Sequence, residues 1–407
     1  MAVGLADVEA YYDLARRDLP GLFGARIKLR QSHQVDVTRR ETPQTTLIRL
    51  PGHTHVIWLH RGSLAYTTEE MRLQNAYGKA LAGLAEVPTS FARTASADVL
   101  TRAVAARCAH SLPRRAEDLE AVIRLVVEQA TTTYEGARVA VNVCVDLNSD
   151  AGGQALADFF KEPWAAVLGS GLSTALMVSG TGAVTSVEDL GNVNNNGLMA
   201  PERFGPLAQW TANAGRVALA ATRNGEIYVF VDSALLFAHR NSQWRGFPLQ
   251  ALVGSGWYAS QGGVPRETKK AVLISLLDAS AAHHGACLGI IRPPRVTEAV
   301  NELVAISERW GTASNPRREV VRHTNFLRLS RRQRLELLSM DGATLLTPRG
   351  EILAAGAILQ VRAGSTGGGR TAAARAIGKF GVGIKVSQDG PVTAYAGPDT
   401  EPRFTIG

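Results

Sequence analysis

The sequence is poor in cysteine, with only 3 among its 407 residues, at Cys108, Cys144 and Cys287. They lie far apart among apolar neighbours, which is typical of buried reduced thiols and not of a disulfide framework. The sequence has no run of about eighteen apolar residues, so we expect no membrane-spanning helix and no membrane partner. The first residues carry acids early and do not show a charged-then-apolar signal pattern, so we expect a cytoplasmic protein by default.

Lysine is also scarce, because only 7 of the 44 basic residues are lysines, while the formal net charge is +8. The others are arginines, whose planar fork suits phosphate, although such a bias also arises from genomic base composition. Seven arginines gather between Arg317 and Arg334. This segment is typical of a solvated helix face, and a surface that attracts nucleotide or nucleic acid is the alternative.

The length and a hydrophobic content of 45% allow two or three domains with full cores. Residues 1–130 have a mixed α/β pattern, with helical spacing clearest over residues 116–130. Residues 131–258 are rich in short strands, which predicts a β-rich region with a sensing, accessory or dimerisation role. Glycine and proline over residues 254–266 predict a linker. Helices then alternate with strands over residues 262–407, which predicts an α/β domain within a multidomain α+β or α/β protein.

Two local patterns predict particular strands. The segment GRVALAATRNGEIYVFVDSALLFAH predicts a hairpin, with Asn224 and Gly225 supplying the two positive-φ positions of a tight turn. The segment WAAVLGSGLSTALMVSG contains two apolar runs separated by glycine and serine, and we expect both runs to be extended.

Other familiar motifs are incomplete. His53 and His55 would share one face of a strand and His60 the other, and no cysteine or carboxylate stands at ligand spacing, so a half-buried strand is favoured over a metal site. Gly378-Lys379 has neither the upstream glycine nor the hydroxyl residue of a Walker-type phosphate loop.

Two stretches near the C-terminus combine the groups that phosphoryl or nucleotidyl transfer requires. In SMDGATLL, Asp341 lies where a helix gives way to a strand, and Gly342 lets a ligand approach the backbone. A carboxylate there can hold a divalent cation or accept a proton from a hydroxyl. In STGGGRTAAARA, Gly368 and Gly369 place bare amides at a helix N-terminus, where Arg370 can bind phosphate through two hydrogen bonds. The alternative is a plain turn and linker.

These residues resemble the motifs of the diadenylate cyclase domain found in the DNA-integrity scanning protein and its relatives. The resemblance covers residues 262–407, with the motifs in the family's order and spacing. The family's DGA motif corresponds to Asp341-Gly342-Ala343, and its following strand to Gly356-Ala357-Ile358-Leu359. Its GTRHRAA motif corresponds to Gly368-Gly369-Arg370-Thr371-Ala372-Ala373-Ala374, and its VSQ strand to Val386-Ser387-Gln388. Upstream, His284-Gly285-Ala286 resembles the start of the family's GAL strand.

The resemblance implies a domain with a mixed central sheet flanked by helices, which binds ATP and joins two ATP molecules into cyclic di-AMP with release of pyrophosphate. It implies a homo-oligomer with facing active sites, under control of the N-terminal region. It also implies Mg²⁺ or Mn²⁺ held by Asp341, which would help to activate the attacking hydroxyl. The implied catalytic residues are Asp341, Gly342 and Arg370, and the implied nucleotide-binding residues are Ala343, Leu359, Gly368, Gly369, Arg370, Thr371, Arg375 and Ser387.

The sequence departs from the family at the RHR positions, which here are Arg370, Thr371 and Ala372. An imidazole and one guanidinium are therefore lost, and each charge-assisted phosphate contact contributes about 1.5–3 kcal/mol. Arg375 follows Thr371 by four residues and would share its helix face, so it is the candidate to replace the lost charge. Two interpretations remain open: a cyclase with a reorganised phosphate site, or a degenerate cyclase fold that senses a nucleotide without converting it.

Overall fold

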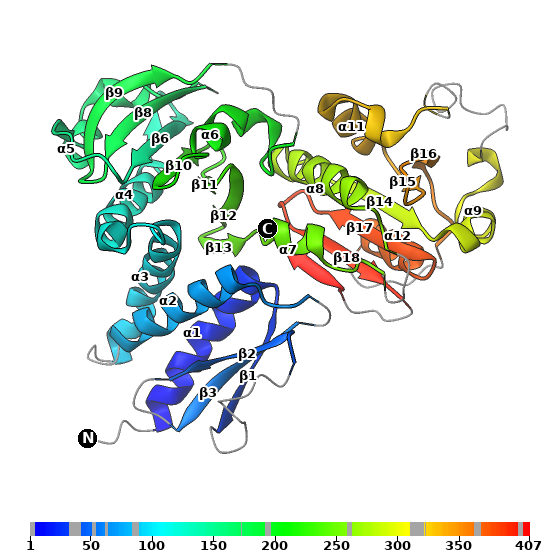
Figure 1. Cartoon of the computed structure of the whole chain (residues 1–407), viewed down its shortest axis with the longest axis horizontal. Coiled ribbons are helices and arrows are strands. Elements are labelled where there is room, and N and C mark those ends of the chain that lie inside the picture. The colour runs from blue at the N-terminus through cyan, green and yellow to red at the C-terminus, as the bar shows by residue number, and fades with distance from the viewer. Residues whose placement is uncertain are drawn as a thin grey trace. The chain divides into compact units, whose positions relative to one another are not determined.

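The computed structural model describes residues 5–31, 42–50, 54–61, 64–83, 89–171, 173–191, 197–258, 263–309, 321, 323–361, 368–397 and 402–407 (Figure 1). The protein is multidomain and mixed α/β. It divides into two compact units, of which the first comprises Met1–Arg61 with Ala65–Pro248, and the second comprises Gly62–Leu64 with Leu249–Gly407. Elements from both the 1–130 and the 131–258 ranges lie in the first unit. The finer division into three functional regions stays a prediction.

The first unit begins with helices and a small antiparallel sheet. The strands on either side of residues 51–53 pair with each other, and the sheet has the order β1-β3-β2. The predicted helix at residues 116–130 is confirmed, since its apolar residues Leu119, Ile123 and Val126 are all buried. These elements are α1 (Leu5–Phe23), β1 (Arg26–Gln31), β2 (Thr45–Arg49), β3 (His55–His60), α2 (Thr68–Gly83), α3 (Thr89–Cys108) and α4 (Ala116–Gln129).

An eight-stranded sheet forms the rest of the first unit, with the order β13-β12-β11-β10-β6-β8-β9-β7. Only the β6–β8 pair is parallel, and the other pairings in this sheet are antiparallel. The strands are β6 (Val141–Asp146), β7 (Gln154–Ala155), β8 (Thr174–Ser179), β9 (Ala183–Asp189), β10 (Arg216–Ala221), β11 (Ile227–Val231), β12 (Ala234–Arg240) and β13 (Gln243–Gly246). The short hairpin β4 (Thr133–Tyr134) and β5 (Ala137–Arg138) and the helices α5 (Leu156–Phe159) and α6 (Gly205–Trp210) complete the unit.

The predicted β10–β11 hairpin is present, but its turn differs from the prediction. Only Gly225 has a positive φ, at 77°, whereas Asn224 does not. The Gly225 amide donates to the Thr222 carbonyl and the Thr222 amide donates to the Glu226 carbonyl. This pattern is that of a turn closed by one left-handed glycine, so the expected pair of positive-φ residues is wrong.

The apolar run that begins at Trp164 is also not a strand. Pro163–Ala166 forms a 3₁₀ turn, η3, and only the second run becomes extended, as β8. Pro163 fixes φ for the first position of the turn and has no amide to give to a sheet. Length and hydrophobicity alone could not separate these two outcomes.

The second unit is built on a six-stranded mixed sheet, with the order β16-β15-β14-β17-β18-β19. Its β14–β15 pair is parallel and its other pairs are antiparallel. All residues of β14 and β15 are buried, so both faces of the sheet centre are covered. The elements are α7 (Leu249–Gly254), α8 (Arg266–Ala281), β14 (Ala286–Ile291), α9 (Val296–Leu303), α11 (Arg331–Leu338), β15 (Ala343–Leu346), β16 (Ile352–Ala357), α12 (Gly369–Gly378), β17 (Gly381–Val386), β18 (Val392–Ala396) and β19 (Phe404–Ile406).

The segment predicted as a linker is largely packed into the second unit. Trp257 is 1% exposed, lies tilted by 57° against Phe404 with 5.8 Å between the ring centroids, and donates its indole N–H to the Leu252 carbonyl at 2.8 Å. The Lys269 ammonium donates to the carbonyls of Val253 and Ser255 at 3.1 and 2.6 Å. The described part of this segment is therefore held by buried aromatic and hydrogen-bonding contacts, and residues 259–262 lie outside the described residues.

Two helices position the loop that carries Asp341. Ser330 caps α11, with its hydroxyl accepting from the Gln333 amide in a reciprocal capping box. Arg331 binds Asp278 of α8 through two hydrogen bonds of 3.0 and 2.6 Å, and both side chains are almost fully buried. This ion pair fixes α11 to α8, so the chain leaves α11 at a defined place on the sheet.

Candidate functional site

A cavity of about 730 Å³ lies within the second unit. The α11–β15 loop, the end of β16, the N-terminus of α12 and the end of β17 all contribute to its wall. It brings together almost all the site residues predicted from the sequence, which come from segments up to 46 positions apart between Asp341 and Ser387. Those lining it are Asp341, Gly342, Ala343, Leu359, Gly368, Gly369, Arg370, Thr371 and Ser387.

The Asp341 loop is fixed by its glycine. Gly342 has φ 100°, and a Cβ there would lie 2.6 Å from the Ala357 carbonyl oxygen of β16, so no other residue fits without moving the strand. The exposed Asp341 carboxylate accepts a hydrogen bond from the Gly342 amide at 3.1 Å. The loop therefore presents an acidic side chain to the cavity while its own backbone stays packed against β16.

The N-terminus of α12 opens onto the same cavity. Its N-cap is Gly368, at φ 80°, and no side chain caps the helix. The first amides of an α-helix have no partner within the helix, so they and the helix dipole favour an anion here. An added Cβ on Gly369 would meet no atom within 4 Å. Packing within the protein therefore does not require glycine at position 369, whereas a ligand approaching the amides does benefit from it.

The exposed Arg370 side chain lines the cavity and lies against Gly285. A Cβ built on Gly285 would be only 2.6 Å from the Arg370 Cζ atom, which places the guanidinium against the chain just before β14. Burial raises the pKa of Cys287, the second residue of β14, to about 12, and the positive charge of Arg370 opposes that rise. The contact with Gly285 places this guanidinium near the start of β14, whose Cys287 also lines the cavity.

The positions that differ from the RHR motif do not supply a second cation. Thr371 is only 4% exposed. Arg375 shares the helix face of Thr371, but it does not line the cavity, and its Cζ lies 5.3 Å from the centroid of the Tyr395 ring on β18. Arg375, which the helical spacing suggested as a substitute, therefore lies between the helix and the sheet and not at the cavity.

Sequence reasoning missed several residues that line the cavity, of which Lys385 and Asp389 carry charge. Both residues flank the Val386-Ser387-Gln388 segment, to which the sequence interpretation was limited. Lys385 lies within a strand whose other residues are all buried, a context that the local sequence does not reveal. Ile358, which is 53% exposed, adds an apolar surface at the cavity wall.

The charged lining is therefore of mixed sign, with carboxylates on Asp341 and Asp389 and cations on Arg370 and Lys385. Across the described ranges, no group of three or more histidine, cysteine or acidic residues is arranged to hold a metal ion by itself. Mg²⁺ is commonly held by only one or two carboxylates together with substrate phosphates and water. The two carboxylates at this cavity fit that mode of binding and do not fit an all-protein metal site.

The predicted half-buried strand with the histidines is β3, and within its described part His60 lies near the Thr45 hydroxyl at 3.2 Å. His53 lies outside the described residues.

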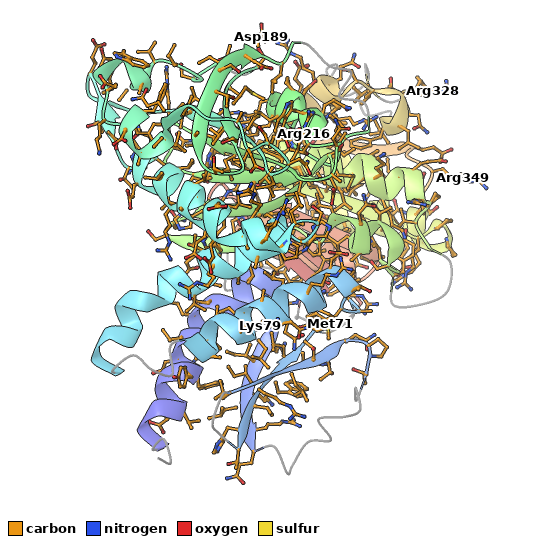
Figure 2. All side chains as sticks on the ribbon, turned by 60° about the vertical axis from the view of Figure 1, so that its left-hand side comes forward. Met71, Lys79, Asp189, Arg216, Arg328 and Arg349 are labelled. Atoms are coloured by element: carbon orange, nitrogen blue, oxygen red, sulfur yellow. The ribbon has the colours of Figure 1, made fainter. Side chains whose placement is uncertain are left out.

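Of the four arginines described in the arginine-rich segment, Arg331 and Arg334 have structural roles, whereas Arg328 and Arg332 are exposed. Arg331 is paired with buried Asp278, and Arg334 donates to the carbonyls of Phe326 and Leu327. Arg328 is exposed and, like Arg349, projects outward in Figure 2. Arg317, Arg318 and Arg322 lie outside the described residues. An arginine count therefore overstated the charge available to nucleic acid, and a nucleic-acid role stays a prediction.

Comparison with known proteins adds little at the sequence level, because no family model and no curated protein matches this chain. Among solved structures, a double cysteine mutant of DacA from Staphylococcus aureus matches with 14% identity and a TM-score of 0.25. The match covers 34% of this chain and 87% of that one. No helix in the described ranges has the length and hydrophobicity that crossing a membrane requires.

Proposed function

We propose that the second unit is a nucleotidyltransferase of the diadenylate cyclase type, which joins two ATP molecules, or related nucleotides, into a cyclic dinucleotide. The observation that carries the proposal is the meeting of the Asp341 loop and the Gly368–Arg370 helix start at one cavity. A carboxylate, a guanidinium and open helix amides are the groups that this chemistry uses to position phosphates and to handle a hydroxyl proton.

Each group has a role in the proposed reaction. The amides at Gly368 and Gly369 and the Arg370 guanidinium bind the phosphates, while Leu359 and Ala343 contact the base or ribose. Ser387 approaches the phosphates from the end of β17. The 3′-hydroxyl oxygen of one ATP bonds to the α-phosphorus of the other, the bond from that phosphorus to pyrophosphate breaks, and Asp341 accepts the hydroxyl proton.

A divalent cation, Mg²⁺ or Mn²⁺, would be held by the Asp341 carboxylate, and Asp389 supplies a second carboxylate to the lining of the same cavity. When bound, such an ion would neutralise phosphate charge. Because each turnover joins two nucleotides, we also propose that two copies of this unit assemble with their cavities facing each other. Control of that assembly by the first unit is part of the same proposal.

A second candidate function is nucleotide binding without turnover. The burial of Thr371 and the absence of a charge on Ala372 favour it, because those positions leave Arg370 as the sole cation of the altered motif. This candidate predicts saturable nucleotide binding that Arg370→Ala abolishes, with no conversion.

Incubation of the full chain with ATP and Mn²⁺, followed by chromatographic separation of products, tests the proposal. We expect a cyclic dinucleotide and pyrophosphate from the wild type, and at least a hundredfold less from Asp341→Asn, which keeps the side-chain size. The matched control is Glu336→Gln, on α11 and outside this cavity, which we expect to retain wild-type turnover. Binding without any product across metals and pH would support the sensor, and failure to bind any nucleotide would exclude both candidates.

A further inference from the structure

Lys385 occupies a defined place beneath the N-terminus of α12. On β17 it pairs in register with Cys287 of β14, so the two side chains lie on the same face of the sheet. Cys287 belongs to the core cluster formed with Ala373, Ala374 and Ile377 of α12, which identifies this face as the one that α12 covers. Gly383, two residues before Lys385, contacts the Ala374 backbone so closely that an added Cβ would overlap it.

These contacts set the direction of the Lys385 side chain. Ala374, in the middle of α12, lies over Gly383 of the strand. From Gly383 the strand runs toward the beginning of α12, and Lys385 follows two residues later. A strand advances about 3.3 Å per residue, so Lys385 reaches the level of the first turn of the helix. Consistent with this position, Lys385 and the Gly368–Arg370 start of α12 line the same cavity.

The surroundings of Lys385 differ from those of two other enclosed cations in this unit, Lys269 and Arg331. Lys269 donates to two carbonyls and Arg331 is paired with Asp278. Lys385 is half-buried and, within the described part of the chain, has neither a hydrogen bond nor an ion pair from its ammonium. An ammonium group that lines a cavity and has no protein partner is available to an anion that enters the cavity, and such charge-assisted hydrogen bonds are stronger than neutral ones.

We propose that Lys385 is a second phosphate-binding residue of the nucleotide site, and that the site is therefore selective for nucleoside triphosphates over monophosphates. This inference rests on the proposed nucleotide-binding function. Arg370 and the helix amides bind one phosphate group of the polyphosphate chain, and the flexible Lys385 ammonium binds another. In this way Lys385 supplies a positive charge that Thr371 and Ala372 do not, from the sheet and not from the helix.

Titration calorimetry of the full chain with ATP and with AMP, in Mg²⁺ buffer, tests this assignment. Lys385→Met keeps the apolar stem and removes the charge, and Lys379→Met is the matched control because Lys379 is exposed and lies beyond the last turn of α12. We expect Lys385→Met to weaken ATP binding about tenfold or more, the size of a lost charge-assisted contact. AMP binding should change less than twofold, Lys379→Met should match the wild type, and Lys385→Arg should recover most of the ATP affinity.

The outcomes separate this inference from the function on which it depends. If the wild type binds ATP and Lys385→Met binds it equally well, the assignment of Lys385 is wrong while the nucleotide site stands. If Lys385→Met loses ATP and AMP to the same extent, or unfolds at a lower temperature in proportion, Lys385 has a structural role and the assignment is again wrong. A wild type that binds neither nucleotide overturns both proposals.

Discussion

The Arg370 guanidinium lies against Gly285, where a side chain of any size would overlap it. Gly285 directly precedes β14, at the base of the cavity, and it is not among the residues with positive φ. Its glycine is therefore explained by the space that Arg370 occupies, and not by the backbone. Through this contact Gly285, which does not itself line the cavity, positions Arg370, which does.

Replacement of Gly285 by alanine should displace Arg370 without unfolding the protein. The new methyl group meets the far end of a flexible side chain, so we expect the free energy of unfolding to change by no more than about 1 kcal/mol. ATP affinity should fall about tenfold, because the charge-assisted phosphate contact is weakened. Calorimetry on Gly285→Ala, Arg370→Ala and the double variant checks this: the two effects should not add, whereas additive losses would show that Gly285 acts independently of Arg370.

The two glycines at the start of α12 should respond differently to alanine. Gly369 has open space around it and lies within the helix, so Gly369→Ala should leave stability unchanged or raise it by up to about 1 kcal/mol. The added methyl nevertheless enters the cavity beside the amides, and nucleotide affinity should fall at least fivefold. Gly368 has φ 80°, so Gly368→Ala should lower the free energy of unfolding by about 1–2 kcal/mol. Urea unfolding and calorimetry together measure both effects, and equal stability losses for the two variants would contradict this account.

The sequence was sufficient to predict that Asp341 and the Gly368–Arg370 segment meet at one cavity, whereas their functional roles stay a prediction. The order of helix, strand and glycine-rich turn places both at the same end of the sheet. The sequence was insufficient to place the Arg375 side chain, because spacing along a helix shows which residues share a face but not which face meets the sheet. In the structure that face meets Tyr395, so the guanidinium packs over the ring and away from the cavity.

Lys385 is a residue whose place at the cavity the sequence did not predict. A lysine within VGIKVSQ is compatible with an edge strand or a solvent-facing position, and nothing local shows which neighbours it will have. Its place became visible only once the register with Cys287 and the contact of Gly383 with α12 were known. The φ pattern of the Asn224-Gly225 turn and the 3₁₀ turn at Pro163 were predicted wrongly for a simpler reason, since their local sequences are compatible with more than one backbone conformation.

The buried pair of Asp278 and Arg331 should be a major determinant of stability in the second unit. Removing one charge leaves the other buried without its partner, so Asp278→Asn should lower the free energy of unfolding by about 3–5 kcal/mol. Replacing both residues by leucine and methionine should be much less damaging, because no uncompensated charge remains. Urea unfolding measures this, with Glu336→Gln as the control, because its pair with Arg332 is exposed and should contribute little. Similar losses for Asp278→Asn and the double variant would contradict the proposed role of the pair.

Cys287 should react slowly with alkylating reagents although it lines the cavity. Burial raises its pKa from 9.0 to about 12, and the thiolate is the reactive form. At pH 8 the thiolate fraction should therefore be about a thousandfold below that of the same thiol in the unfolded chain. Because the folded-state pKa is raised, reactivity should continue to increase about tenfold per pH unit above pH 9, where an ordinary thiol levels off. Iodoacetamide labelling followed by mass spectrometry of the Cys287 peptide, with and without urea, measures the difference. Rapid labelling of Cys287 in the folded protein at pH 8 would show instead that the cavity floor is open to water, and that the packing of Arg370 against Gly285 does not shield it.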